Sequence, residues 1–258
     1  MRVGPALRRR IRRAGSRGIL KLPTNVRRPA LTVASRVQGG PVVLMGPPPG
    51  PALVVAPHPD DEVIGPGGTV ALHLAAGDDV TVLVVTSGDA GAGGQRDRSA
   101  IREQESCRAL RHLGTPYAPH FARLADGTLQ RSIDRVAQLI AEHGRDAAAI
   151  YVPTLWDPHP DHAAVATAAM SCGLDEDVLI LGYEVWGAGP ITALVDVTTV
   201  FARKQAALAE YTTALETVDY VRTASGLAAY RSSQGAMGGR GFAEGFVAMP
   251  LGEYRRLG

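Results

Sequence analysis

Two short stretches of the sequence gather histidines and carboxylates at a spacing that can bind a metal ion. Residues 58–62 read His-Pro-Asp-Asp-Glu and follow the apolar run 52–55, while residues 156–162 read Trp-Asp-Pro-His-Pro-Asp-His and follow the apolar stretch 147–154. A catalytic zinc site needs three nitrogen or oxygen ligands and an open position, and His58, Asp61 and His162 would supply such a set. A metal held there lowers the pKa of its bound water towards about 7, which provides a nucleophile at neutral pH.

Each stretch on its own also has a purely structural interpretation. His-Pro-Asp is typical of turns, and Asp60 or Glu62 could cap the helix that follows. Together, however, the two stretches hold three of the seven histidines of the chain. The other four lie on expected helices or in a weak strand and are interpreted as structural or solvent-facing: His73, His112, His120 and His143.

Apolar runs and amphipathic stretches alternate along the chain. Strands are expected at 52–58, 79–89, 117–129, 147–154 and 177–186, and helices at 68–78, 98–114, 132–144, 162–173 and 198–215. In the helix over 98–114, Ile101, Leu110 and Leu113 are expected to face inward. Ser132 is expected to cap the helix that Gly144 ends.

This alternation predicts an α/β fold, with one Rossmann-like, mostly parallel sheet and helices on both faces, in a single domain. Ligands of such sheets bind beyond the carboxyl ends of the strands. The stretches 58–62, 87–94 and 156–162 each follow an expected strand. We therefore expect all three on the same rim of the sheet, so that the two halves of the metal site meet.

The two metal-binding stretches also carry a family resemblance. "APHPDDE" at 56–62 and "HPDH" at 159–162 resemble the zinc-dependent N-acetylglucosaminyl de-N-acetylases of the PIG-L or LmbE-like family, with Pro57 as a departure from the family pattern. The resemblance extends over about residues 50–250 through shorter matches: Arg102 with Glu105, "LADGTL" at 124–129, "YEVW" at 183–186, "KxxAL" at 204–208, "GLAAYR" at 226–231 and "AEGF" at 243–246.

The resemblance implies a role for each residue of the two stretches. His58, Asp61 and His162 would hold one Zn²⁺ per chain, or another divalent metal. Asp60 would be the general base, and His159 would stabilise the oxyanion. Asp161 would fix the tautomer of His159 and keep it charged. Glu62 would orient the site or place a charge at a helix N-terminus.

Three further residues are candidates for binding the substrate. Asp126, in "LADGTL", could accept hydrogen bonds from sugar hydroxyls, although an aspartate before glycine is equally typical of a β-turn. Arg102 could reach the rim, or could form a surface pair with Glu105 one helical turn away. Trp186 could stack on a sugar or could be buried in the core.

Charge divides the 258-residue chain into a basic start and an acidic body. Residues 1–59 contain eleven Lys or Arg and no Asp or Glu, although the whole chain has a net charge of only +2. We therefore divide the chain into a basic extension with a Pro/Gly-rich linker, residues 1–50, and a deacetylase domain, residues 51–258. The extension is expected to be a disordered or loosely docked arm, with binding of nucleic acid or anionic lipid and an organelle transit peptide as alternatives.

The expected function is hydrolysis of the amide of an N-acetylated or N-acylated amino sugar, with release of acetate and a free amine. An N-acetylglucosaminyl small molecule or a natural-product glycoside, as in antibiotic biosynthesis, is the expected substrate. The alternatives are a metal-dependent hydrolase of another bond, such as a phosphoester, and a polyanion-binding protein. No nucleic-acid partner is expected, and homo-oligomerisation stays open. The two cysteines and the lack of an apolar run of about 18 residues favour a cytoplasmic protein without a transmembrane segment.

Overall fold

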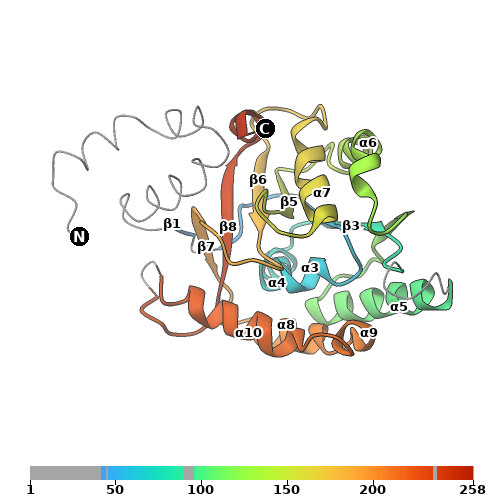
Figure 1. Ribbon diagram of the computed structural model, residues 1–258. Coiled ribbons are helices and arrows are strands. Elements are labelled where there is room, and N and C mark those ends of the chain that lie inside the picture. The colour runs from blue at the N-terminus through green and yellow to red at the C-terminus, as the bar shows by residue number, and fades with distance from the viewer. Residues whose placement is uncertain (1–41, 45, 90–95, 235–236, 258) are drawn as a thin grey trace, which may run out of the picture.

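An eight-stranded sheet forms the centre of the molecule (Figure 1). The computed structural model describes residues 42–44, 46–89, 96–234 and 237–257. Within them the strand order is β1-β7-β8-β6-β5-β2-β3-β4. The strands are β1 (Val42–Leu44), β2 (Ala52–Ala56), β3 (Val80–Thr86), β4 (His120–Leu124), β5 (Ala149–Pro153), β6 (Leu179–Tyr183), β7 (Ala193–Asp196) and β8 (Ala243–Pro250).

All neighbouring strands pair in parallel except at β8, which runs antiparallel to both β6 and β7. The central strand β2 pairs with β3 through Val54 and Val82 and with β5 through Val54 and Tyr151. Both β2 and β5 are buried along their whole length, as is typical of parallel strands covered on two faces. The expected α/β fold with a mostly parallel sheet is confirmed.

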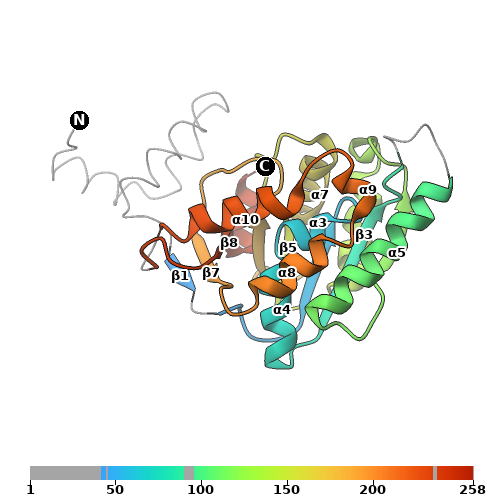
Figure 2. The ribbon, with the colours of Figure 1, turned by 90° about the horizontal axis from the view of Figure 1, so that it is seen from below.

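Helices cover both faces of the sheet (Figures 1 and 2). Alternate residues of β2 enter two separate cores, with Val54 in one and Val55 in the other. The first core is covered by α3 (Asp61–Ile64), α4 (Gly67–Ala76), α5 (Arg96–Leu113), α8 (Phe201–Leu208) and α10 (Tyr220–Arg231). The second is covered by α6 (Ile133–His143), α7 (Pro160–Met170) and α11 (Leu251–Tyr254).

Two expected local features differ in the structure. Ile101 is 45% exposed, whereas Leu110 and Leu113 are buried as expected. The inward stripe of α5 therefore lies towards its C-terminal half. Ser132 occupies the N-cap position of α6 without a capping side-chain hydrogen bond, while Gly144 ends that helix as expected.

The segment after β7 was expected to form one long helix over 198–215 but forms two. Helix α8 ends at Leu208, and the short helix α9 (Thr212–Leu215) begins after a break. The hydroxyl groups of Thr212 and Thr213 donate to the carboxylate of Glu105 on α5. These tertiary hydrogen bonds hold the two threonines away from the axis of α8, which local sequence periodicity does not reveal.

The N-terminal basic extension lies almost entirely outside the described residues, since the description begins at Val42. Val42–Leu44, which we assigned to the linker, form β1 and pair with β7 at one edge of the sheet. The sheet therefore begins before residue 50. Among the described helices, none is both long enough and apolar enough to cross a membrane.

Candidate metal and active site

The structure brings His58, Asp61 and His162 together at the carboxyl ends of β2 and β5. His58 Nδ1 lies 3.1 Å from Asp61 Oδ2, His162 Nε2 lies 3.2 Å from the same oxygen, and the two imidazole nitrogens are 3.3 Å apart. All three side chains are nearly or fully buried. Residues separated by more than 100 positions thus present one triangle of ligand atoms.

This triangle fits a small divalent metal. Ligand atoms placed tetrahedrally at ~2.0–2.2 Å from zinc lie about 3.3–3.6 Å from one another, close to the 3.1–3.3 Å observed here. Two wider groupings around His58 also keep ligand atoms within 4.8 Å of one another, one with His159 and His162 and one with Asp126 and Asp161. The tighter set with Asp61 has the atom separations that match the coordination distances best.

The second ring nitrogen of His58 faces carboxylates. His58 Nε2 lies 3.1 Å from Asp126 Oδ1 and 3.5 Å from Asp161 Oδ2. A metal-binding histidine commonly donates its other N–H to a carboxylate, which fixes the ring and raises its basicity. Asp126 and Asp161 therefore orient His58 with Nδ1 towards the ligand triangle. Asp126, expected to bind sugar hydroxyls, lies close enough to the site for both roles.

Asp157 lies beside the second ring nitrogen of His162, as Asp126 and Asp161 lie beside that of His58. The sequence alone did not suggest a role for Asp157. Its Oδ1 lies 3.2 Å from His162 Nδ1, but this nitrogen has no aligned hydrogen bond, so we treat the contact as electrostatic. The same carboxylate accepts hydrogen bonds from the backbone N–H groups of His159 and Trp186. Its position two residues before the first histidine of "HPDH" is the sequence signal that could have identified it.

Asp60 is buried next to the ligand triangle and is held by Arg102. Arg102 Nη2 donates to Asp60 Oδ2 at 3.0 Å and to Pro59 O, while Nη1 donates to Gly88 O. Burial raises the pKa of Asp60 to about 7, although the positive charge of Arg102 opposes the shift. A carboxyl group with a pKa near neutrality is suited to general acid–base work.

Arg102 therefore reaches the rim, as expected. Its guanidinium group is hydrogen-bonded to Asp60, the candidate general base. The alternative pairing of Arg102 with Glu105 does not form. Glu105 instead accepts hydrogen bonds from Thr212 and Thr213. Arg102 Nε is buried without a hydrogen-bond partner.

Glu62 is hydrogen-bonded to the backbone of Asp60 and to two hydroxyl groups of neighbouring segments. Its Oε2 accepts the backbone N–H of Asp60 at 2.9 Å, and its Oε1 accepts hydrogen bonds from the hydroxyls of Ser106 and Tyr211. These partners come from the start of α3, from α5 and from the segment between α8 and α9. Glu62 thus fixes the backbone that presents Asp60, in agreement with an orienting role.

The role expected for Asp161 towards His159 needs correction. The Asp161 carboxylate accepts the backbone N–H groups of Gly127 and Leu129 and faces His58. Its backbone N–H, and not its side chain, donates to His159 Nδ1 at 3.2 Å. Because Nδ1 accepts, the proton of neutral His159 lies on Nε2. Burial and the nearby His58 and His162 also lower the pKa of His159, so its surroundings favour the neutral ring and not the charged one.

Trp186 lies at the edge of the site. Its side chain is 54% exposed, which argues against the core alternative, and its ring centroid lies 6.2 Å from that of His159. An exposed indole beside a buried polar centre is suited to stacking against a sugar ring. Trp186 therefore remains a candidate for substrate binding.

Comparison with known proteins agrees with this site. The family model described as PIG-L, GlcNAc-PI de-N-acetylase, matches residues 53–172, which contain both stretches with the candidate metal ligands. The 1D-myo-inositol 2-acetamido-2-deoxy-alpha-D-glucopyranoside deacetylase of Rhodococcus erythropolis is 31% identical over 152 residues, which are 46% of this chain and 52% of that protein. The chain thus spans about half the length of the curated relatives it matches.

Solved structures share the fold over a larger part of the chain. A conserved protein from Thermus thermophilus has a TM-score of 0.63 and 26% identity, over 77% of this chain and 94% of its own. The N,N'-diacetylchitobiose deacetylase from Pyrococcus horikoshii has a TM-score of 0.63 and 22% identity, over 78% and 84%. The chain is thus similar to the PIG-L family over residues 53–172, and it shares the fold of these solved structures over a larger part of its length.

Proposed function

We propose that the chain is a metal-dependent N-deacetylase that hydrolyses the amide of an N-acylated amino sugar and releases a carboxylate and a free amine. The observation that carries this proposal is the triangle of His58, Asp61 and His162 with 3.1–3.3 Å sides, beside the buried carboxyl group of Asp60. The family match and the name of the Rhodococcus relative, an acetamido-glucopyranoside deacetylase, support an N-acetylglucosaminyl substrate.

Zinc is the metal that we propose. Two imidazole nitrogens, one carboxylate oxygen and an open position form a donor set typical of catalytic zinc sites, although other divalent ions bind similar sets. When bound, such a metal polarises the amide carbonyl and lowers the pKa of a bound water. Among the described residues one such tight triangle is present, which favours one ion per chain. One ion argues against phosphoester hydrolysis, for which many enzymes use two ions.

The residues around the triangle divide the remaining chemistry. Asp60 takes a proton from the attacking water and returns it to the leaving amine, and Arg102 keeps its carboxylate in place. General acid–base catalysis of this kind contributes about 10²–10⁴-fold to the rate. His159 donates from Nε2 to the developing oxyanion, since its Nδ1 accepts the Asp161 backbone N–H.

The proposal extends to substrate and location. We propose a small amino sugar, such as a natural-product glycoside, with Trp186 and Asp126 contacting the sugar. We also propose a cytoplasmic location, supported by Cys107 and Cys172, which are both free. We also propose that the chain can form a homo-oligomer.

The test is a panel of N-acetylglucosaminides assayed for released amine. Metal-free protein should be inactive and should recover with one equivalent of Zn²⁺, and amine and acetate should appear in equal amounts. A phosphorylated substrate that releases phosphate while every amide stays intact would favour the phosphoesterase alternative and contradict the proposal.

A further inference from the structure

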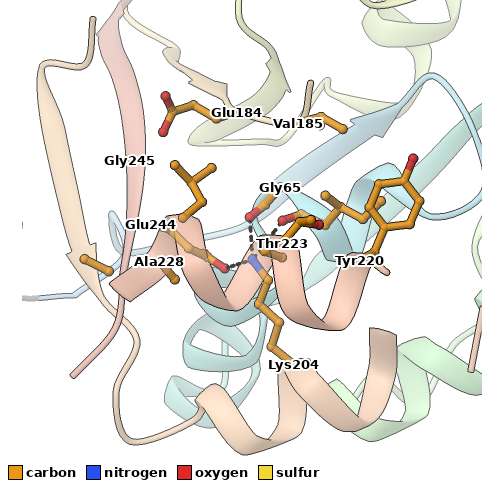
Figure 3. A pocket seen from close by; sticks show the side chains of 13 residues that line it. Gly65, Glu184, Val185, Lys204, Tyr220, Thr223, Ala228, Glu244 and Gly245 are labelled. Carbon is orange, nitrogen blue, oxygen red and sulfur yellow. Dashed lines mark hydrogen bonds and ion pairs between the residues drawn. The ribbon is translucent and has the colours of Figure 1, made fainter. Parts of the chain in front are cut away.

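A hollow of about 70 Å³ lies beside the metal site and has no role in the chemistry above. Its walls come from the end of α3, the segment after β6, helix α10 and the start of β8 (Figure 3). Four stretches that the sequence analysis singled out meet here: "YEVW", "KxxAL", "GLAAYR" and "AEGF" contribute Glu184, Lys204, Leu227 and Glu244, respectively.

The hollow shares two walls with the active site. The backbone N–H of Ile64 donates to Asp60 O at 2.9 Å, and that of Gly65 donates to Asp61 O at 3.0 Å, so the residues lining the hollow are bonded directly to those of the metal site. On the second wall, Val185 lines the hollow, while the next residue, Trp186, lies beside the active-site ring of His159. The hollow and the metal site are therefore neighbours on one rim.

The charged groups of the hollow are already paired with protein partners. Lys204 Nζ donates to Ile64 O and Gly65 O, each at 2.9 Å, and to Glu244 Oε1 at 2.6 Å (Figure 3). Glu244 also accepts the backbone N–H groups of Gly68 and Thr69. The charges of Lys204 and Glu244 therefore cancel, and both side chains use their hydrogen bonds on protein atoms around the hollow.

The second carboxylate of the wall is paired as well. Glu184 is bound by Arg231 through both carboxylate oxygens. The remaining wall includes the apolar residues Ile64, Val185, Ala224, Leu227 and Ala228 and two hydroxyl-bearing residues, Tyr220 and Thr223. The Thr223 hydroxyl donates to the backbone O of Asp219. Because the charged groups are paired within the wall and most other lining side chains are apolar, the hollow suits an uncharged, largely apolar group better than a sugar ring, whose hydroxyls need several hydrogen-bond partners.

We propose that this hollow binds the acyl chain of the substrate and sets its length. The inference rests on the proposed deacylase function. An N-acyl amino sugar has its polar ring on one side of the amide and its apolar chain on the other. Asp126 follows β4, whereas the hollow lies near β6 and β8, on the other side of β2 and β5 in the strand order. A sugar bound at Asp126 directs the acyl chain towards the hollow.

The volume limits the chain that fits. An apolar cavity of about 150 Å³ holds the six carbons of benzene, so a hollow of about 70 Å³ has room for about three carbons. Three carbons beyond the carbonyl correspond to a butanoyl group. Because each buried methylene contributes about 0.8 kcal/mol, kcat/KM should rise about fourfold per methylene from acetyl to butanoyl and fall again at hexanoyl.

The test measures kcat/KM of the zinc-loaded protein on N-acetyl-, N-propanoyl-, N-butanoyl- and N-hexanoylglucosamine. Two variants at one position change the hollow in opposite directions: Leu227→Ala widens it and Leu227→Phe narrows it. Leu227→Ala should raise the hexanoyl-to-acetyl ratio at least tenfold, and Leu227→Phe should lower the butanoyl-to-acetyl ratio at least tenfold. Val221→Ala is the matched control, since Val221 lies on the same helix but does not line the hollow.

The outcomes separate this inference from the proposed function. If acetyl substrates are hydrolysed but both Leu227 variants keep the wild-type ratios, the deacylase function stands and the acyl hollow is wrong. If Leu227 variants change the preference between methyl and butyl glycosides, with the acyl preference unaltered, the hollow binds the aglycone instead, which also overturns the inference. If no N-acyl amino sugar is hydrolysed, the proposed function and the inference both fail.

Discussion

The backbone N–H of Asp161 donates to Nδ1 of His159 at 3.2 Å, while the Asp161 carboxylate faces the other way, towards His58 Nε2. One residue thus orients two histidines, the first through its main chain and the second through its side chain. Replacing the side chain tests this division, because it leaves the main-chain contact in place.

Asp161→Asn should weaken metal binding more than it alters His159. Loss of a carboxylate behind a ligating histidine typically lowers metal affinity about 10–100-fold, and competition with a chelator would measure this. An unchanged metal affinity together with a shifted pKa of His159, followed by NMR, would instead support a side-chain role for Asp161 towards His159.

His162→Ala and Asp60→Asn should separate binding from catalysis. His162→Ala removes one corner of the ligand triangle, so the protein should lose most of its metal, which elemental analysis of the purified variant would show. Asp60→Asn keeps the triangle but removes the base, so turnover should fall about 10²–10⁴-fold with one metal ion retained. Full metal retention by His162→Ala would refute the ligand assignment.

Metal affinity should rise with pH. Burial lowers the pKa of His162, but the carboxylates of Asp61 and Asp157 outweigh it and raise the pKa to about 9 in the metal-free protein. Metal ligands must be deprotonated, so metal binding at pH 7 should release protons, measurable by calorimetry in buffers of different ionisation enthalpy.

The stability of the metal-free protein should change in the opposite direction. A histidine with a raised folded-state pKa stabilises the fold fully below its unfolded value of about 6.5, and this contribution is lost as pH rises through about 9. The difference in Tm between the zinc-bound and metal-free proteins should therefore widen from pH 6.5 to 9. A constant difference, with no proton release, would contradict the raised pKa.

Arg231 should position the loop that carries Trp186. Arg231 binds both oxygens of Glu184 and also donates to Gly189 O at 2.8 Å, and Gly189 N donates back to Glu184. Because Arg231 and Glu184 are buried, Arg231→Met should cost about 3–5 kcal/mol of unfolding free energy. It should also raise KM more than it lowers kcat.

The exposed Arg222 on the same helix provides the matched control for this prediction. Arg222→Met should leave both the unfolding free energy and KM near the wild-type values. The double variant Glu184→Gln/Arg231→Met should recover part of the lost stability, because it removes the unpaired buried charge. A double variant no more stable than Arg231→Met would show that the two side chains are not coupled.

Deleting residues 1–41 should leave the metal site intact. The deletion removes all eleven basic residues of the N-terminal extension but retains β1, which pairs with β7. Activity on a neutral N-acetyl sugar should change less than about threefold, whereas any attraction of anionic substrates should become less sensitive to salt. A truncated protein that binds zinc but acts on no substrate would show that the extension contributes to the active site.

The local pattern of the sequence was sufficient to predict the central part of the fold and which candidate ligand residues lie together. Apolar runs identify β2 and β5, and parallel strands place the loops that follow them on one rim. His58, Asp61 and His162 therefore meet in the structure as the order of elements along the chain required. The pairing of β1 with β7 and the antiparallel insertion of β8 were not predictable, because they depend on strand order and not on local periodicity.

Only the tertiary structure decided which residues contact and orient the candidate ligands and the loop that carries Trp186. Asp157 beside His162, the two separate contacts of Asp161, and the pairing of Glu184 with Arg231 across 47 positions depend on distances that no spacing in the sequence encodes. A buried charge must find a partner to offset its desolvation, but which residue supplies that partner is set by how helices pack on the sheet. The candidate ligands at the rim of the sheet follow from local sequence, whereas the residues that orient them follow from how the helices pack on the sheet.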